Sequence, residues 1–126
     1  MFRKGLVMFF ITAGLVACSQ SDAPARVVED YFTALVEKDD VLAVNLSCLE
    51  WEEIAKAEGA SFEGVEVILE SASCVVVEED GKSATVTCSG KFVFSYAGGE
   101  VEEIGLDRRD YFVVFEGGDW RMCGYK

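Results

Sequence analysis

Hydrophobic residues recur at helical spacing in the stretch that follows Pro24. They fall three or four positions apart over residues 27–36, and charged or polar residues fill the positions between them. This period is typical of an amphipathic helix that buries one face. Asp22 and Pro24 suit a helix start, because an acid can cap it and proline needs no N–H partner in the first turn. Lys38, Asp39 and Asp40 then break the pattern, so we predict a first helix of about four turns.

Two shorter helical segments are predicted next, over residues 41–46 and from Cys48 through Trp51 to Gly59. From Phe62 onward the period changes to two, which is typical of half-buried strands. Apolar and polar residues alternate over 65–70 and over 84–96. The segments 74–77, 101–115 and 120–125 are also expected to be strands. Glycine-containing turns separate these segments at 80–81, 98–99 and 117–118.

The third of these strands carries an irregularity. Its apolar positions are even-numbered up to Leu106 and odd-numbered from Tyr111, and a bulge within residues 107–110 would reconcile the two. Helices followed by a meander of long strands predict an α+β domain, in which N-terminal helices pack on a curved antiparallel four-stranded sheet.

The first 18 residues predict an export signal. Arg3 and Lys4 precede an apolar run over residues 5–17, which is shorter than the roughly 20 residues that a membrane helix needs. The run ends in Leu15-Val16-Ala17-Cys18, which resembles a bacterial lipobox. We expect a signal peptide over 1–17, a lipidated Cys18 at the head of a polar tether over 18–23, and a folded domain over 24–126. An ordinary secretory signal and an uncleaved anchor are the alternatives.

This export signal predicts a domain held by acyl chains on the extracytoplasmic face of a bacterial membrane, in the periplasm or at the cell surface. Hydrophobic residues make up 51% of the chain, which excludes a disordered acidic tail. The chain has 23 acidic and 11 basic residues and a formal net charge of −12. Such a charge argues against nucleic acid as a partner and against direct adhesion to anionic lipid.

Four further cysteines, Cys48, Cys74, Cys88 and Cys123, would lie outside the reducing cytoplasm and are expected to form two disulfides. No CxxC pair and no histidine is present, which disfavours a zinc site or a redox catalyst. Cys74 and Cys88 flank the turn at 80–81 almost symmetrically, which favours pairing 74–88 with 48–123. Side-chain alternation places Cys88 on the face expected to look toward the helices and Cys48, so the other pairing stays open.

Two segments carry a resemblance to NTF2-like domains. Residues 25–39, Ala-Arg-Val-Val-Glu-Asp-Tyr-Phe-Thr-Ala-Leu-Val-Glu-Lys-Asp, resemble the first helix of that family. Residues 118–125, Gly-Asp-Trp-Arg-Met-Cys-Gly-Tyr, resemble its last strand. The whole is similar to small bacterial NTF2-like (SnoaL-like) lipoproteins of unassigned function, many of which carry cysteines at places that match Cys48 and Cys123. The resemblance covers residues 24–125 and implies a cone in which a curved sheet wraps around helices and leaves a pocket.

Enzymatic NTF2-like domains place an acid in that pocket, often with a histidine or a tyrosine. The chain has no histidine, which excludes a His-Asp base. Asp30 beside Tyr31 or Tyr111 could abstract a proton if the acid were buried, although the helical spacing favours a solvent-facing Asp30. Aromatic residues could line an apolar pocket or simply form core: Tyr31, Trp51, Phe92, Phe94, Tyr96, Tyr111 and Trp120.

Two charged groups are candidate binding sites. An acid-rich helical face, Glu50, Glu52, Glu53 and Glu58, could hold calcium but lacks a calcium-loop pattern, so we expect it to be solvated. Arg108 and Arg109 could bind a ligand carboxylate, but local pairing with neighbouring acids is the favoured interpretation.

We therefore expect a non-catalytic domain that binds a small apolar ligand or an envelope protein, without a cofactor or metal. The alternatives are an isomerase- or dehydratase-type enzyme that uses Asp30 and a tyrosine, and a structural protein-interaction module.

Overall fold

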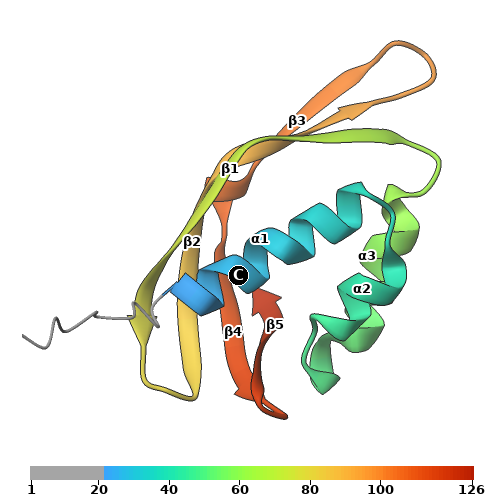
Figure 1. The fold of residues 1–126 in the computed structure, drawn as a ribbon. Helices are drawn as coiled ribbons and strands as arrows, with labels where there is room; N and C mark the ends of the chain where they lie inside the picture. Colours follow the sequence, from blue (N-terminus) through green and yellow to red (C-terminus); the bar gives the residue numbers. More distant parts are fainter. Residues whose placement is uncertain (1–21) are drawn as a thin grey trace, which may run out of the picture.

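The computed structural model describes residues 22–126, which form helices on one side of a curved antiparallel sheet (Figure 1). The predicted α+β class, with the helices first and the strands after them, is confirmed. The predicted signal peptide and Cys18 lie outside the described residues. Within residues 22–126, no helix has both the length and the apolar character needed to cross a membrane. The elements are α1 (Asp22–Val36), α2 (Asp40–Asn45), the 3₁₀ turn η1 (Leu49–Trp51), α3 (Glu52–Phe62), β1 (Glu66–Glu79), β2 (Ser83–Ser95), β3 (Val101–Gly105), the 3₁₀ turn η2 (Leu106–Arg108), β4 (Asp110–Glu116) and β5 (Asp119–Tyr125).

The sheet runs in the order β1-β2-β4-β5, and β3 pairs with β2 beyond the end of β4. The first part of β2, over 83–87, pairs with β4, and its last part, over 91–95, pairs with β3. The predicted strand over 101–115 is therefore two strands, and the sheet has five strands rather than four. A turn at η2, rather than the predicted bulge, changes the parity of the inward-facing residues. Leu106 is buried in that turn, and its carbonyl oxygen accepts a 2.8 Å hydrogen bond from the Tyr111 hydroxyl.

A bulge bends the long β1–β2 pair. The register shifts between Glu70 and Ser73, so that Ser71 and Ala72 face the single residue Gly90. Ser71 has a φ of 53° and Gly90 a φ of 99°. A Cβ atom at Gly90 would lie 2.6 Å from the carbonyl oxygens of Glu70 and Ser71, which no side chain tolerates. The bend directs the two strands over the helices, as Figure 1 shows.

The core lies between α1 and the concave face of this sheet. Phe32 is 3% exposed, and its ring centroid lies 5.4 Å from that of Phe92 and 5.1 Å from that of Tyr111, both edge-to-face. Val28, Val86 and other apolar side chains complete the cluster. Aromatic contacts of this geometry contribute about 0.5–1.5 kcal/mol beyond the area they bury. The predicted amphipathic helix thus buries the face that its sequence pattern indicated.

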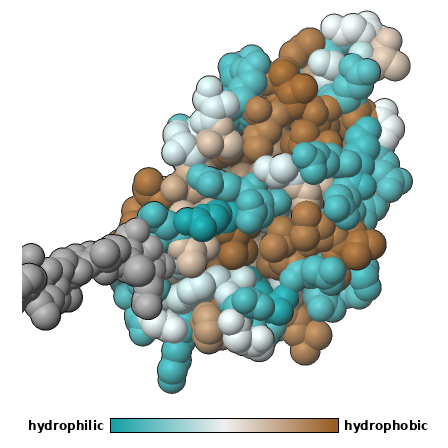
Figure 2. All heavy atoms as spheres, in the orientation of Figure 1, coloured by the Kyte–Doolittle hydropathy of each residue, from teal (hydrophilic) through white to brown (hydrophobic). Residues whose placement is uncertain are grey.

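The surface is polar but carries separate apolar patches, which Figure 2 shows as brown areas between teal ones. Large hydrophobic side chains that are at least half exposed come from α2, η1 and both ends of the sheet: Val41, Leu49, Ile68, Val75, Val77, Val101 and Phe115. Scattered exposed apolar residues are normal in soluble domains and by themselves identify no partner.

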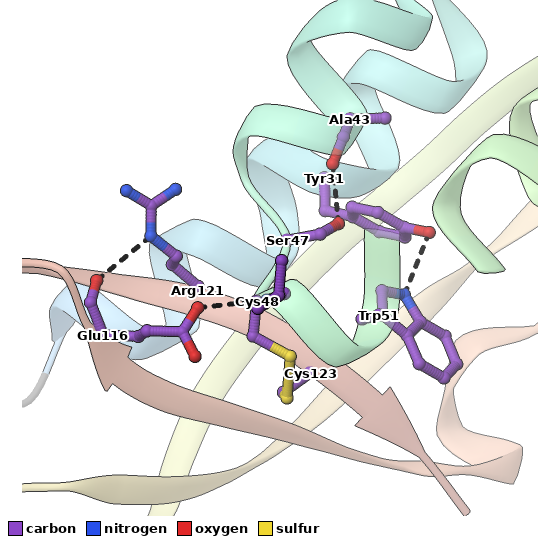
Figure 3. Close-up of a disulfide and its surroundings, with 9 residues drawn as sticks. Tyr31, Ala43, Ser47, Cys48, Trp51, Glu116, Arg121 and Cys123 are labelled. Carbon is purple, nitrogen blue, oxygen red and sulfur yellow. Dashed lines mark hydrogen bonds between the residues drawn. A yellow bond between two sulfur atoms is a disulfide. The ribbon is translucent and has the colours of Figure 1, made fainter. Parts of the chain in front are cut away.

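Two disulfides join the layers and the strands. Cys74 bonds to Cys88, its register partner across β1 and β2, and Cys48 bonds to Cys123 of β5. The pairing that the turn favoured is therefore confirmed. Figure 3 shows the Cys48–Cys123 bond beside β5. Backbone hydrogen bonds reinforce this link, since the Cys48 N–H donates to the Met122 carbonyl oxygen at 2.8 Å and the Met122 N–H donates to that of Leu46 at 2.7 Å.

The two disulfides should differ in their effect on stability. They close loops with sequence separations of 75 residues for Cys48–Cys123 and 14 for Cys74–Cys88. The chain-entropy relation then gives about 4.5 kcal/mol for the long loop and about 3 kcal/mol for the short one. We expect the double alanine variant at Cys48 and Cys123 to lose more free energy of unfolding than the one at Cys74 and Cys88. Urea unfolding at 25 °C measures both, and a reversed order would contradict this expectation.

Candidate functional site

A cavity of about 420 Å³ opens between α1, α3 and the part of the sheet where β2 pairs with β3. Its volume is within the range of small-molecule sites. Glu58 and Ser61 of α3 and the two arginines Arg108 and Arg109 supply its polar lining. The apolar wall contains Ile104 and Leu106 together with six aromatic rings: Phe32, Phe62, Phe92, Phe94, Tyr111 and Tyr125.

The aromatic wall is a connected set of rings. The centroid of Phe62 lies 5.4 Å from those of Phe92 and Phe94, and the Phe62–Phe94 pair is stacked. Phe92 and Phe94 point to one side because they are two positions apart on β2. Phe62 closes the set from the last residue of α3. Rings held by several neighbours change position little, so the cavity wall is preformed.

The aromatic residues singled out from the sequence are divided between four places. Phe92, Phe94 and Tyr111 line the cavity, whereas Tyr31 and Trp51 lie outside its lining and reach it through Glu58, as described below. Trp120 packs against Phe115 at a centroid distance of 5.5 Å, near Ala23, and does not line this cavity. Tyr96 is 42% exposed and donates a 3.0 Å hydrogen bond to Glu102.

Glu58 is the centre of a hydrogen-bond network behind the aromatic wall. The Tyr31 hydroxyl donates to Glu58 Oε1 at 2.5 Å, and the Tyr125 hydroxyl donates to Oε2 at 2.9 Å. Trp51 Nε1 donates in turn to the Tyr31 oxygen at 3.2 Å, an interaction visible in Figure 3. Trp51 also packs edge-on against Tyr125 at 5.3 Å. One carboxylate therefore orients two tyrosines from different elements, α1 and β5.

The tyrosines around this network are held in their neutral form. Burial is the largest cause that raises the pKa of Tyr31, and the hydrogen bond to Glu58 raises it further. Burial and the Glu58 charge also raise the pKa of Tyr125. Burial raises the pKa of Tyr111 to about 12, although the positive charge of Arg109 opposes the shift. All three hydroxyls therefore remain hydrogen-bond donors across the physiological pH range.

Glu58 was expected on a solvated acidic face with Glu50, Glu52 and Glu53, and for this residue the expectation is wrong. Glu58 is half-buried and bonded to two tyrosines, whereas Glu53 is exposed and pairs with Lys56 at 3.0 Å. The sequence did contain a signal. Glu58 follows buried Ala55 by three positions and precedes buried Phe62 by four, which places it on the apolar stripe of α3.

Asp30 cannot serve as the base of this cavity. It is exposed on α1 and does not line the cavity. The hypothesis of a buried Asp30 that abstracts a proton beside Tyr31 or Tyr111 is therefore wrong. The helical period explains this. Residues three or four positions apart share a helix face, whereas Asp30 lies only one and two positions before the buried residues Tyr31 and Phe32.

Arg108 and Arg109 do not form the expected local ion pairs. The ion pairs within residues 22–126 join Lys56 to Glu53, Lys91 to Glu70 and Glu103, and Arg121 to Asp119. Arg109 instead lies over the Tyr125 ring, with its guanidinium carbon 4.1 Å from the ring centroid. Both arginines are among the residues that line the cavity.

The described part of the chain contains no set of side chains arranged as metal ligands. Within residues 22–126, no group of three or more histidine, cysteine, aspartate or glutamate side chains is placed to hold a metal ion. The four cysteines of this region are bonded in pairs.

Sequence comparison and structural comparison give different results for this chain. No protein-family model matches it, and no curated protein matches it significantly. Solved structures do match. A SEC-C motif-containing protein from Rhodopseudomonas palustris has a TM-score of 0.56 at 16% identity, covering 82% of this chain and 79% of its own.

Two further structures extend the comparison. A candidate scytalone dehydratase from Novosphingobium aromaticivorans has a TM-score of 0.53 at 14% identity, covering 77% of this chain and 74% of its own. Aln2 from a Streptomyces species has a TM-score of 0.52 at 13% identity, covering 79% of this chain and 82% of its own. At these identities the likeness concerns the fold alone. Both proteins have NTF2-like folds, and residues 22–126 of this chain share that fold.

The tyrosine network makes a prediction about alkaline pH. The pKa values of Tyr31, Tyr96, Tyr111 and Tyr125 are all raised in the folded protein, so their stabilising contribution is complete below pH 10. It is lost as the pH rises through the folded values, which is about 12 for Tyr111. Absorbance at 295 nm should show less tyrosinate in the native protein at pH 10 than in the unfolded chain, which is about half ionised.

Removing the Glu58 charge tests the cause of these shifts. We expect Glu58→Gln to move the native tyrosine titration to lower pH, because the negative charge that opposes ionisation of Tyr31 and Tyr125 is gone. Glu53→Gln on the same helix is the matched control and should leave the titration unchanged. An equal shift in both variants, or half-ionised tyrosines in the native protein at pH 10, would refute this account.

Proposed function

We propose that the protein is a lipid-anchored, extracytoplasmic, non-catalytic domain that binds a small, mainly apolar ligand in the cavity of its NTF2-like cone. The observation that carries this proposal is the cavity of about 420 Å³ with six aromatic rings in its wall. Specific sites for small molecules are concave, mainly apolar and furnished with a few polar groups, and this cavity meets each condition. Among NTF2-like proteins, the small bacterial SnoaL-like lipoproteins are the group to which we assign the chain.

The anchored location is supported by two independent observations. Leu15-Val16-Ala17-Cys18 follows a short apolar segment with basic residues before it. Both disulfides are of a kind that persists in oxidising compartments and is rare in the cytosol. Acyl chains on Cys18 would then hold the acidic domain beside a membrane whose anionic lipids it does not attract.

A binding role is favoured over catalysis by the state of the polar groups. The sequence has no histidine, and Asp30 is exposed. Both Glu58 oxygens already accept tyrosine hydroxyls, and the tyrosines are held neutral. These groups orient one another rather than a reacting atom. A structural interaction module is the weaker alternative, because such a module would need a large apolar patch and no internal cavity.

The lipid anchor is tested by replacing its nucleophile. We expect the wild-type protein to partition into the detergent phase of Triton X-114, with a lipidated Cys18 at its N-terminus by mass spectrometry. Cys18→Ser should abolish the acyl modification, because serine lacks the thiol that carries it. Ser19→Ala is the matched control and should remain lipidated. A wild-type protein whose N-terminus is a residue other than Cys18, or whose Cys18 carries no lipid, would contradict the anchor hypothesis.

The cavity is tested with a neutral aromatic probe, 2-naphthamide, and the full chain reconstituted in nanodiscs. Isothermal titration calorimetry against empty nanodiscs should detect binding to the wild type. Ser61→Trp places an indole at a residue that lines the cavity and should weaken binding at least about tenfold, equivalent to about 1.4 kcal/mol. Thr33→Trp adds the same bulk at an exposed position of α1 and should bind as the wild type does. Equal binding by both variants would place the probe elsewhere.

A further inference from the structure

The mouth of the cavity carries two positive charges in a strongly acidic chain. The sequence has 23 acidic and 11 basic residues, yet Arg108 and Arg109 are adjacent and both line the cavity. A cavity that received only neutral ligands would gain nothing from two guanidinium groups at its edge. A negatively charged ligand, by contrast, needs a local positive field, because the rest of this surface repels it.

The two guanidinium groups are available for a ligand. Neither belongs to the ion pairs of residues 22–126, which involve Lys56, Lys91 and Arg121. An arginine presents five N–H donors in a planar fork and matches carboxylate oxygens in a bidentate manner. Arg109 also contacts the Tyr125 side chain, which leaves further donors of the two guanidinium groups for an anion.

Arg109 is held in place before any ligand arrives. Its guanidinium carbon lies 4.1 Å from the centroid of the Tyr125 ring, and the Tyr125 hydroxyl is bonded to Glu58. The other neighbours of that ring are Trp51 at 5.3 Å and Tyr111 at 6.2 Å. A guanidinium stacked on a ring keeps its N–H donors at its edge, where a second group can bind. Part of the entropic cost of binding an anion is therefore already met by the fold.

Arg108 is positioned by the turn that divides β3 from β4. Leu106 anchors this turn, since its side chain is 2% exposed and its carbonyl oxygen accepts from the Tyr111 hydroxyl at 2.8 Å. Asp107 lies close to Gly105, where an added Cβ would be 2.6 Å from its carboxylate oxygen. The 3₁₀ turn therefore brings Arg108 to the cavity together with Arg109 of the following residue.

Glu58 is the acidic group that lines this cavity, and its charge is already compensated in part. Two tyrosine hydroxyls donate to it, at 2.5 Å and 2.9 Å. The lining contains two arginines and one such carboxylate, so its balance of charge is positive. The rings of Phe62, Phe92 and Phe94 line the same cavity and are each 8% exposed, whereas both arginines are exposed.

We propose that the ligand is an amphiphilic anion, whose carboxylate or similar acidic group binds Arg108 and Arg109 at the cavity mouth while its apolar body packs against the phenylalanine wall. This inference rests on the proposed function and adds the chemical class of the ligand. It also identifies the two arginines as the residues that distinguish an acid from a neutral molecule of the same shape.

The test compares 2-naphthoate with 2-naphthamide, which have the same ring system and differ in charge. Isothermal titration calorimetry uses the full chain in nanodiscs, with empty nanodiscs as background. We expect the wild type to bind naphthoate at least about tenfold more tightly, since hydrogen bonds between two charged groups are stronger than those to a neutral group. Naphthoate affinity should fall as salt is raised, while naphthamide affinity should not.

Substitutions at the two arginines test whether they cause the preference for 2-naphthoate over 2-naphthamide. Arg108→Gln with Arg109→Gln should remove the preference, so that the ratio of naphthoate affinity to naphthamide affinity falls to about one. Arg109→Lys keeps the charge but loses the planar fork, and should retain only part of the preference. Arg26→Gln is the matched control, because Arg26 is exposed on α1 and does not line this cavity.

The outcomes separate this inference from the proposed function. Binding of both probes with equal affinity to the wild type, or a preference for naphthoate that survives in the double variant, would overturn the inference and leave the cavity as a site for neutral ligands. Failure of both probes to bind would overturn the proposed cavity function itself. The salt dependence is measured on the wild type, so the inference can be refuted even if the double variant does not fold.

Discussion

The bend where Gly90 faces Ser71 and Ala72 is the constraint on which the rest of the structure depends. A straight β1–β2 pair would lie flat against α1 and leave no space beyond it. A Cβ at Gly90 would collide with the backbone of β1, so only glycine allows the paired strands to approach so closely at the bulge and to bend there. The strands then curve over the helices (Figure 1), which carries Phe92 and Phe94 toward α3 and leaves a cavity between them.

Electrostatics then gives this cavity a distinct character within an acidic molecule. Burial keeps Tyr111 and its neighbours neutral, so the tyrosines act as donors rather than as charges. Glu58 accepts two of those hydroxyls and fixes the Tyr125 ring, and Arg109 lies on that ring. A chain of contacts thus runs from the helical layer to the cavity mouth, and each contact restricts the next.

The sequence was sufficient where structure depends on local pattern. The helical period of α1 and the alternation along β2 predict the α+β class, and the symmetric placement of Cys74 and Cys88 about a turn favours the disulfide pairing that the structure has, although side-chain alternation leaves another pairing open. Each of these features involves residues that are close in sequence or regularly spaced. If Cys74 bonds to Cys88, then Cys48 and Cys123 are the two cysteines that remain to form the second disulfide.

The features that the sequence did not reveal depend on contacts between distant segments. The turn at η2 replaced a bulge because β2 is long enough to pair with two strands, which the pattern within 101–115 could not indicate. The acidic neighbours of Glu58 in the sequence predict a solvated position for it, whereas its hydrogen-bond partners come from α1 and β5. The arginines were assigned to nearby acids, whereas Arg109 stacks on the Tyr125 ring from the last strand.

Native mass spectrometry of the protein purified from its own envelope tests most directly the claim that the cavity is a ligand site. The account predicts that the wild type retains a small molecule with an acidic group and an apolar body. It also predicts that the Ser61→Trp variant, purified in the same way, retains none. A wild type with no added mass, or the same added mass in both proteins, would contradict the account.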